Sequence, residues 1–223
     1  MPTTYYAEQA SAVANAFAQF TAALSDFDSE NLAEIIPQFH DLSLRIAQLN
    51  QAIDNASEPL LISAQASIKF IQSQQAFVEI IADMTKSLPL RVTHNDTKIN
   101  NLLFSKKTNK PVAVIDLDTC MAGYLMHDFG DMIRTCCPSI AEDSPELDNM
   151  TIDWDMLTAL TSAYVAGFNG AISEIERTSL LFGIKLMPFM LSTRFLTDFL
   201  NGDRYFKTTY ASHNLVRESI TTI

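Results

Sequence analysis

Three polar side chains interrupt the apolar run Leu90–Phe104, LRVTHNDTKINNLLF, and their types and spacing could carry chemistry. Asp96 stands at the start of a short loop, and Asn101 stands at its end, where the next apolar run begins. A carboxylate can accept the proton of an attacking hydroxyl, and carboxylate and amide oxygens can hold Mg²⁺ against phosphate. The pattern His94-x-Asp96-x-x-x-x-Asn101 therefore indicates phosphoryl transfer, with Asp96 as the candidate base and Asn101 as a candidate metal ligand.

A further carboxylate, Asp116, follows the buried-strand pattern KPVAVID. It lies about one hairpin after the loop, where the catalytic loop of protein kinases needs its second Mg²⁺ ligand. The nearby HDFGD contains Asp128-Phe-Gly, which imitates the metal-binding motif of those enzymes. Asp128 lies too far from Asp96, however, and no apolar strand precedes it. We therefore expect Asp116 to bind metal and Asp128 to accept backbone N–H bonds from the loop.

Each of these residues also has a purely structural interpretation. We expect His94 to be a core histidine whose ring bonds a carbonyl group. Asp96 could cap the turn, and Asn101 could close it as an Asx-turn. For Asp96, Asn101 and Asp116 together the chemical interpretation is the stronger one. The three-residue spacing alone recurs by chance in about one chain per hundred of this length, and Asp116 adds a further match.

Helices are expected on both sides of this strand-and-loop unit, so the expected fold class is mainly α (α+β), with helices around a small β-hairpin unit. They are predicted from apolar spacing at residues 5–25, 38–54, 59–86, 125–137, 152–168, 173–200 and 210–221. A short helix is expected after Ser29, and Pro188 is expected to kink the helix at 173–200 or to divide it in two. The predicted strands are the β-branched runs at 90–94, 101–104 and 111–116. The acidic segment 138–149 is expected to be a surface loop.

The composition excludes several classes of protein. The 223 residues are 48% hydrophobic and 18% charged, which is typical of a globular domain with a proper core. A formal net charge of −11 without a basic patch argues against nucleic-acid binding. The absence of an 18-residue apolar run argues against a membrane span, and the N-terminus does not resemble a signal peptide. Cys120, Cys136 and Cys137 fit reduced thiols, so a cytoplasmic location is expected, with the adjacent pair filling the core.

The motifs VTHNDTKINNLLF and AVIDLDTCMAGYLMHDFGD resemble those of the aminoglycoside-phosphotransferase-like kinases, small-molecule kinases that share the protein-kinase fold. The forms HNDTK.NN.LF, IDLDT.M.G and DFGD.IR are closest to the N-acetylhexosamine 1-kinase branch. IPQFHD (Ile36–Asp41) and RFLTDFLNGDRYF (Arg194–Phe206) also match, so the resemblance spans nearly the whole chain. It implies ATP as phosphoryl donor, Mg²⁺ as cofactor, Asp96 as base, and Asn101 and Asp116 as Mg²⁺ ligands.

The same resemblance implies that the acceptor is a sugar, phosphorylated at the anomeric hydroxyl of an N-acetylhexosamine. It places Arg194 and Tyr205 around that sugar. Without the resemblance, Arg194 would be interpreted as part of an ion pair on a helix surface, and Tyr205 as an aromatic residue of the core. The triplet Phe39-His40-Asp41 matches a family motif and carries no assigned role.

The chain departs from that family because it has no Gly-x-Gly-x-x-Gly loop and no strand Lys before Asp96. We therefore expect one kinase-like C-terminal lobe over residues 1–223, with the N-terminal nucleotide lobe absent. Its parts would be a helical region at 5–88, the catalytic loop and hairpin at 90–118, and a second helical region at 125–222. The uncovered apolar interface would favour a homodimer or a separate N-lobe.

Two classes of function stay open at this level. The first is ATP- and Mg²⁺-dependent phosphotransfer to a sugar hydroxyl, for which the lobe alone would lack half of the nucleotide contacts. The second is a non-catalytic remnant that binds sugar or docks on a partner. Within the kinases, the acidic charge would suit an aminoglycoside or amino-alcohol acceptor, but the motif forms favour a hexosamine.

Overall fold

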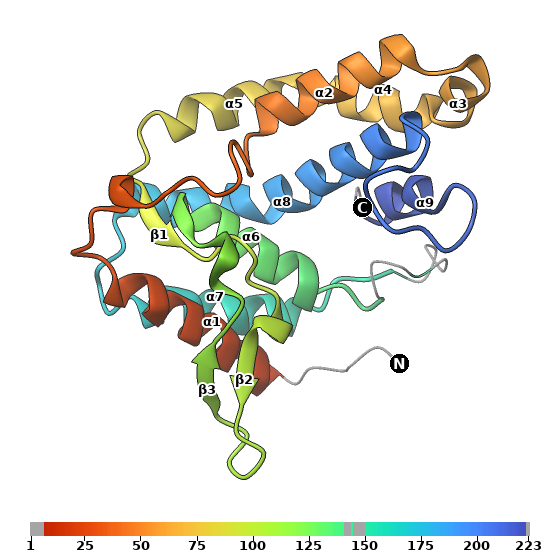
Figure 1. Cartoon of the computed structure of the whole chain (residues 1–223). Helices are drawn as coiled ribbons and strands as arrows, with labels where there is room; N and C mark the ends of the chain where they lie inside the picture. Colours follow the sequence, from red (N-terminus) through yellow and green to blue (C-terminus); the bar gives the residue numbers. More distant parts are fainter. Residues whose placement is uncertain (1–6, 141–143, 145–149, 222–223) are drawn as a thin grey trace. The chain divides into compact units, whose positions relative to one another are not determined.

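The protein is mainly helical, with two small antiparallel β-sheets among its helices (Figure 1). This computed structural model describes residues 7–140, 144 and 150–221. It confirms the expected mainly α (α+β) class, in which helices accompany a β-hairpin. The chain divides into two compact units. The first falls within Met1–Pro37, Leu88–Ser139 and Thr151–Met187, and the second within Gln38–Ser87, Ile140–Met150 and Pro188–Ile223.

The first unit contains the strands. Its helices are α1 (Ala7–Ala23), α6 (Leu125–Cys136), α7 (Trp154–Gly167) and the part of α8 (Glu174–Leu200) up to Met187. Its strands are β1 (Arg91–Thr93), β2 (Leu102–Phe104), β3 (Pro111–Val114) and β4 (Met121–Gly123). The expected hairpin is formed by β2 and β3, with Leu102 opposite Val114. The strand β4, which the sequence pattern does not predict, pairs antiparallel with β1.

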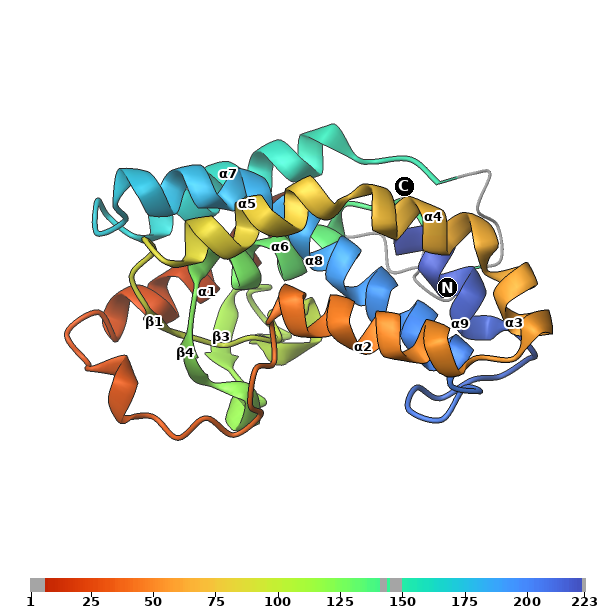
Figure 2. The ribbon, with the colours of Figure 1, turned by 90° about the horizontal axis from the view of Figure 1, so that it is seen from above.

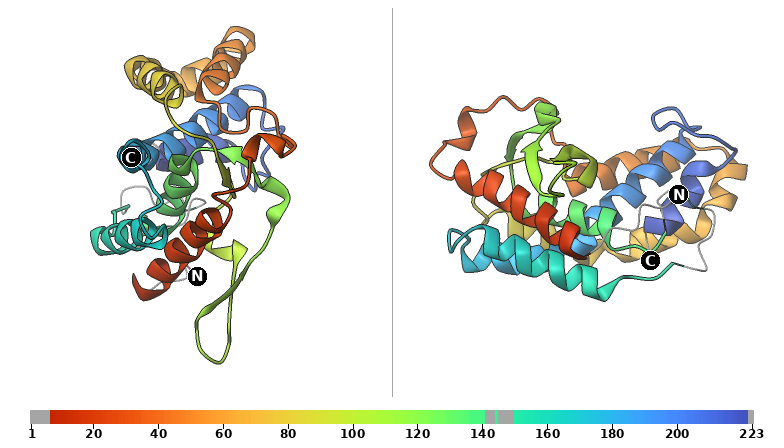
Figure 3. Two further views of the ribbon diagram at one scale, coloured as in Figure 1. Left: turned by 90° about the vertical axis from the view of Figure 1, so that its left-hand side faces the viewer. Right: turned by 90° about the horizontal axis from the view of Figure 1, so that it is seen from below.

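Helix α1 lies alongside α7 and supplies one wall of the first unit's core (Figure 3). Its buried apolar residues recur at the spacing of a single helix face: Ala10, Val13, Ala14, Phe17 and Ala18. Four small residues let the helices approach closely, while Phe17 fills the space between them. Full burial of a side chain such as Phe17 contributes about 2–3 kcal/mol. The expected helix at 5–25 is thus confirmed from residue 7 onward.

The tripeptide Asp128-Phe129-Gly130 lies in α6 and is used for packing. The ring of Phe129 is buried against Tyr164 of α7, with 5.3 Å between the ring centroids. A Cβ atom on Gly130 would overlap the backbone of Gly183 in α8, so the two helices touch backbone to backbone. The helix predicted at 125–137 is confirmed. The packing of Phe129 and Gly130 accounts for these two residues of the D-F-G sequence without a role in metal binding.

The second unit is helical. It contains α2 (Leu42–Asn55), α3 (Glu58–Ser63), α4 (Gln65–Ser73), α5 (Gln75–Thr85), the part of α8 from Pro188 and α9 (His213–Thr221). Figure 2 shows α2, α4 and α9 gathered around the C-terminal part of α8. The buried ring of Phe189 on α8 meets Phe70 edge-on at 6.4 Å and Phe77 at 5.9 Å.

The single helix expected at 59–86 is wrong, because the structure divides this stretch into α3, α4 and α5. The breaks fall at Ala64 and Gln74, without a Gly or Pro. A serine precedes each break and bonds the preceding turn: Ser63 Oγ donates to the carbonyl of Pro59 at 3.0 Å, and Ser73 Oγ donates to that of Phe70 at 2.6 Å. Such bonds compete with regular helical hydrogen bonding and bend helices.

Three other expectations need smaller corrections. Helix α2 begins at Leu42, not at 38, because Asp41 caps it by accepting the N–H of Leu44 at 3.0 Å. The short helix expected after Ser29 is only a 3₁₀ turn, Ser29–Asn31. Residues 174–200 form one continuous helix through Pro188, so the alternative of two helices in succession is wrong. The helices expected at 152–168 and 210–221 are confirmed as α7 and α9, while most of the acidic segment 138–149 lies outside the described residues.

Two expectations drawn from composition also have outcomes. In the described part of the chain one helix, α8, is long and apolar enough to cross a membrane, but 56% of its most apolar window is buried within the protein, as in the core helices of globular domains. Cys136 and Cys137 lie in the core of the first unit, as expected. Burial raises the pKa of the Cys137 thiol to about 12, which makes it unreactive near neutral pH.

A buried ion pair joins β1 to the start of α8. Glu176 is 1% exposed and accepts hydrogen bonds from Arg91 Nε at 2.7 Å and Nη2 at 3.0 Å. It also closes a capping box by accepting the N–H of Ser173 at 2.9 Å. Burial alone would raise the pKa of Glu176, but the bonds from Arg91 and Ser173 outweigh it, and the pKa is lowered.

Glu176→Gln is expected to lower the free energy of unfolding by about 3 kcal/mol at pH 7, because the neutral amide removes the charge that pairs with Arg91 and leaves one acceptor oxygen for the donors that now share two. The carboxylate stabilises the fold when it is ionised, so this difference is fully present above the unfolded pKa, near 4.5, and is lost as the pH falls through the lower folded value. Urea unfolding of both proteins between pH 7 and 3 measures it. A difference that stays constant over this range would contradict the prediction.

Candidate functional site

The loop at residues 94–101, which the sequence predicts to be catalytic and which we call the catalytic loop, connects β1 to β2 and is held by Asp128 of α6. The buried Asp128 carboxylate accepts the N–H of His94 at 2.9 Å and that of Asn95 at 2.7 Å. The Asp128 carbonyl accepts the hydroxyl of Thr97 at 2.6 Å. This is the contact that the sequence predicts for Asp128. Burial raises the pKa of Asp128 to about 6, although the two backbone bonds oppose the rise.

His94 is fully buried and connects the two halves of the site. Its Nδ1 accepts the N–H of Asp96 at 3.3 Å, so the proton is on Nε2, which donates to the carbonyl of Ile115 at 2.9 Å. The ring of Phe17 meets the imidazole edge-on at 5.2 Å between centroids. His94 is therefore the carbonyl-bonded core histidine that the sequence predicts, and it links the residue before Asp116 to the backbone of Asp96.

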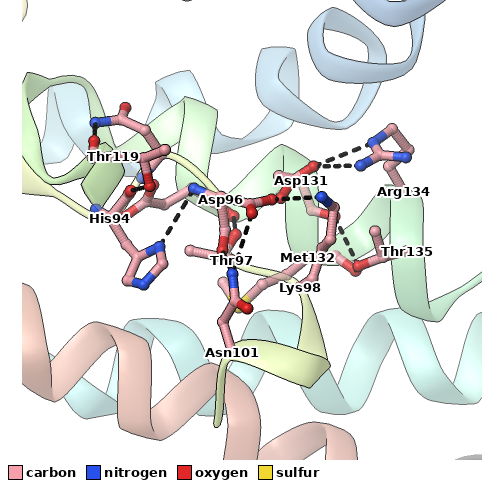
Figure 4. Close-up of polar contacts among 12 residues, drawn as sticks. His94, Asp96, Thr97, Lys98, Asn101, Thr119, Asp131, Met132, Arg134 and Thr135 are labelled. Carbon is pink, nitrogen blue, oxygen red and sulfur yellow. Dashed lines mark hydrogen bonds and ion pairs between the residues drawn. The ribbon is translucent and has the colours of Figure 1, made fainter. Parts of the chain in front are cut away.

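Asp96 and Asn101 face each other across the loop (Figure 4). Asn101 Nδ2 donates to the Asp96 carbonyl at 2.7 Å and to its carboxylate Oδ2 at 3.1 Å. The amide nitrogen is thereby turned toward Asp96, which leaves the Asn101 Oδ1 as the oxygen available to a cation. The Asp96 side chain is 23% exposed, so an acceptor can reach its carboxylate.

Lys98 pairs with the same carboxylate, and the sequence interpretation assigns it no role. Its Nζ lies 2.9 Å from Asp96 Oδ1, and its side chain is 49% exposed. The one signal in the sequence is its position two residues after Asp96 on a loop. An exposed ion pair of this kind contributes at most about 1 kcal/mol to the stability of the fold. Its main effect is to place the positive charge of Lys98 beside the Asp96 carboxylate.

Asp116 follows β3 in the left-handed conformation, with φ of 63°, and is exposed. The segment around it is tied to the catalytic loop. The Ile115 N–H donates to the Asn101 carbonyl at 2.9 Å, and Thr119 Oγ1 donates to the His94 carbonyl at 2.7 Å. The structure thus brings the segments that carry Asp96, Asn101 and Asp116 together within the first unit.

The donor set of this site suits Mg²⁺ bound together with phosphate. The described residues contain no cluster of three or more His, Cys, Asp or Glu that could enclose a metal alone. Mg²⁺ is usually held by one or two protein oxygens plus substrate phosphates and water, so the oxygens of Asn101 and Asp116 are sufficient. They would hold the ion, which neutralises charge on the transferring phosphate when bound.

Arg194 and Tyr205 lie in the second unit and contact each other there. The Arg194 guanidinium carbon lies over the rings of Phe39, Tyr205 and Phe206, at 5.8, 5.7 and 5.4 Å from their centroids. Arg194 Nη2 also lies 3.5 Å from the Tyr205 hydroxyl. Tyr205 is 73% exposed, so its interpretation as a core aromatic residue is wrong. We call Phe39, Arg194, Tyr205 and Phe206 the aromatic–arginine cluster.

The cluster gives a role to part of the triplet Phe39-His40-Asp41. Phe39 packs against Arg194, and Asp41 caps α2. Arg45 holds the segment by donating to the carbonyls of Gln38 at 3.1 Å and Phe39 at 2.9 Å. Burial and the neighbouring charge of Arg194 lower the pKa of Arg45, so two guanidinium groups lie near each other here.

Comparison with known protein families gives one finding. Residues 2–158 match the sequence model of the phosphotransferase enzyme family. The match covers more than half of the 223 residues and includes the catalytic loop, Asp116 and Asp128.

Proposed function

Since the chain belongs to the phosphotransferase enzyme family, we propose that it takes part in ATP- and Mg²⁺-dependent transfer of a phosphoryl group to a sugar hydroxyl. One observation carries the proposal. The Asp96 carboxylate is oriented by the amide of Asn101 and accompanied by Lys98, on a loop that Asp128 fixes to α6. The Asn101 amide binds one oxygen of the Asp96 carboxylate and Lys98 binds the other, and a carboxylate that only caps a turn would need neither contact.

The chemistry follows from these groups. Asp96 accepts the proton of the acceptor hydroxyl while the acceptor oxygen forms its bond to the γ-phosphorus of ATP. The bond from that phosphorus to the β–γ bridging oxygen breaks, and ADP leaves with the electron pair. Asn101 and Asp116 would hold Mg²⁺, and Lys98 offers a cation to the phosphate oxygens. Two exposed apolar side chains next to the ligands, Leu103 and Ile115, suit a nucleobase.

The aromatic–arginine cluster supports a neutral sugar over a cationic acceptor. An exposed Tyr205 ring can stack on the apolar face of a sugar, and Arg194 can donate to hydroxyl or acetyl oxygens. The charges of Arg194 and Arg45 would repel an aminoglycoside or amino alcohol. We therefore place an N-acetylhexosamine, phosphorylated at its anomeric hydroxyl, first among the acceptors. Because the cluster lies wholly within the second unit, a non-catalytic sugar-binding module is the second candidate function.

ADP release, measured with Mg-ATP and N-acetylglucosamine, N-acetylgalactosamine, kanamycin or choline, tests the proposal. Release with a hexosamine supports it. Release only with kanamycin or choline would overturn the acceptor, and sugar binding in calorimetry without ADP release would favour the non-catalytic module.

Asp116→Asn is expected to raise the Mg²⁺ concentration for half-maximal activity by at least about tenfold, because it removes a charged ligand. A Mg²⁺ titration of ADP release measures this. The matched control is Asp118→Asn, an exposed carboxylate two residues away, which should leave the requirement unchanged. Equal shifts in both variants would show that only general surface charge is involved.

A further inference from the structure

The loop that follows α8, residues 201–206, has every one of its backbone N–H groups bonded back to the end of that helix. The first three donate to backbone carbonyls: Asn201 to Thr197, Gly202 to Phe199, and Asp203 to Asp198. The next three donate to the side chain of Asp198. Left-handed backbone at Gly202 (φ 86°) and Asp203 (φ 55°) makes this reversal possible.

Asp198 is the centre of the arrangement. Its Oδ1 accepts the N–H of Arg204 at 2.9 Å and that of Tyr205 at 2.8 Å, and its Oδ2 accepts the N–H of Phe206 at 2.9 Å. The side chain of Asn214 on α9 adds a fourth bond to Oδ2 at 2.9 Å. Asp198 is 5% exposed, so these charge-assisted bonds form away from water, where they are strongest.

This rigid backbone carries an exposed side chain. Tyr205 is 73% exposed although its N–H is fixed to a buried carboxylate, and its ring meets Phe206 edge-on at 4.8 Å. Asp198 stands four residues after Arg194 on α8, so the two residues share one face of the helix. Asp198 therefore ties the backbone of Tyr205 to the helix face that carries Arg194.

We propose that Asp198 is a positioning residue for acceptor binding: it pre-organises the Tyr205 ring beside Arg194 as a platform for a neutral, hydroxyl-rich ring. The inference rests on the proposed function, in which Arg194 and Tyr205 contact the acceptor. A side chain held in its binding geometry before the ligand arrives loses little entropy on binding, so the benefit appears as affinity. If the Asp198 carboxylate only capped the end of the helix, its replacement would leave the affinity for the acceptor unchanged.

Asp198→Asn is the direct test. The four donors that now share the two carboxylate oxygens of Asp198 would have only the single oxygen of the Asn side chain to bind. We expect hydrogen exchange at the amides of 204–206 to rise at least tenfold. We also expect the calorimetric affinity for N-acetylglucosamine to fall about tenfold, and KM for this sugar to rise with kcat within about twofold. Asp203→Asn is the matched control: among the described residues the Asp203 side chain accepts a hydrogen bond from the Asn214 side chain alone, at 2.8 Å, and an amide oxygen can still accept it.

The outcomes separate this inference from the proposed function. Wild-type affinity in a folded Asp198→Asn variant would overturn the inference alone, whereas a wild-type protein that binds no N-acetylglucosamine would overturn the proposed acceptor and the inference with it. Tyr205→Ala should lose affinity without faster exchange. If Asp198→Asn does not fold, Asn214→Ala removes one of the four bonds and should give smaller changes in both readouts; unchanged affinity with faster exchange would again contradict the inference.

Discussion

Under the proposed function, Asp96→Asn is expected to reduce the turnover number for phosphoryl transfer by about 10³-fold, within the range that a positioned general base contributes. The substituted amide has nearly the same shape and can still accept the bond that Asn101 donates to the carboxylate at 3.1 Å. It cannot take a proton from the acceptor hydroxyl. The ion pair with Lys98 is also lost, but that pair is partly exposed and contributes at most about 1 kcal/mol to folding.

The expected signature is a catalytic loss without a structural one. Steady-state ADP release gives the turnover number, and urea unfolding should show a free energy within about 1 kcal/mol of the wild type. Asp118→Asn again serves as the control, since it changes an exposed carboxylate in the turn after β3. A turnover number of Asp96→Asn within tenfold of the wild type would contradict the role of Asp96 as the base and would favour the alternative that Asp96 only caps the turn.

Asp128→Asn is expected to destabilise the fold by about 3 kcal/mol and to loosen the catalytic loop. The carboxylate accepts two neighbouring backbone N–H groups, one on each oxygen. An amide has one acceptor oxygen, and its NH₂ group would face the other N–H, so a buried donor is left unsatisfied. Hydrogen exchange at the amides of His94 and Asn95 should rise together with the loss of stability.

Asp131→Asn, on the same helix, is the control for this second prediction. Asp131 is buried and pairs with Arg134 at 2.6 Å, so its substitution should also cost stability. It should leave exchange at His94 and Asn95 unchanged, because Asp131 makes no hydrogen bond to the catalytic loop in the described structure. Equal exchange in the two variants would contradict the specific role of Asp128.

The pH dependence distinguishes Asp128 further. Its pKa is about 6 in the folded protein against an ordinary value of 3.8, because it is buried, so the folded state takes up this proton more readily than the unfolded state. The contribution of this group to stability therefore rises as the pH falls from about 6 toward 4, and Asp128→Asn lacks that rise. Protonation also weakens one acceptor, so the protection factor of the His94 amide, which corrects for the intrinsic pH dependence of exchange, should fall below pH 6 relative to that of other buried amides in the wild type.

Local pattern predicts much of this fold, and the reasons for its failures are physical. Helix α6 and the β2–β3 hairpin follow from apolar period and turn composition. Strand β4 is only Met121–Gly123 and exists because β1 is beside it, which no local pattern reveals. The breaks at Ala64 and Gln74 coincide with serine hydroxyls that bond the preceding turn, and serine composition alone does not predict a break.

The candidate site shows the same limit. The spacing of Asp96, Asn101 and Asp116 is a sequence signal, because chemistry requires those residue types. The supporting contacts are not: Lys98 and Asp198 look like ordinary charged residues until the structure shows which atoms they meet. The exposure of Tyr205 likewise depends on a loop that folds back on its own helix.

The division of the chain has a practical consequence for anyone who wishes to study its parts. Each unit is assembled from three separated stretches of sequence, and the boundary between the units falls inside α8, between Met187 and Pro188. Neither unit can be obtained as one continuous fragment of the chain, because stretches of the other unit interrupt each of them. Dissection of this protein will therefore depend on point substitutions and circular permutation, and fragment expression is the wrong tool for it.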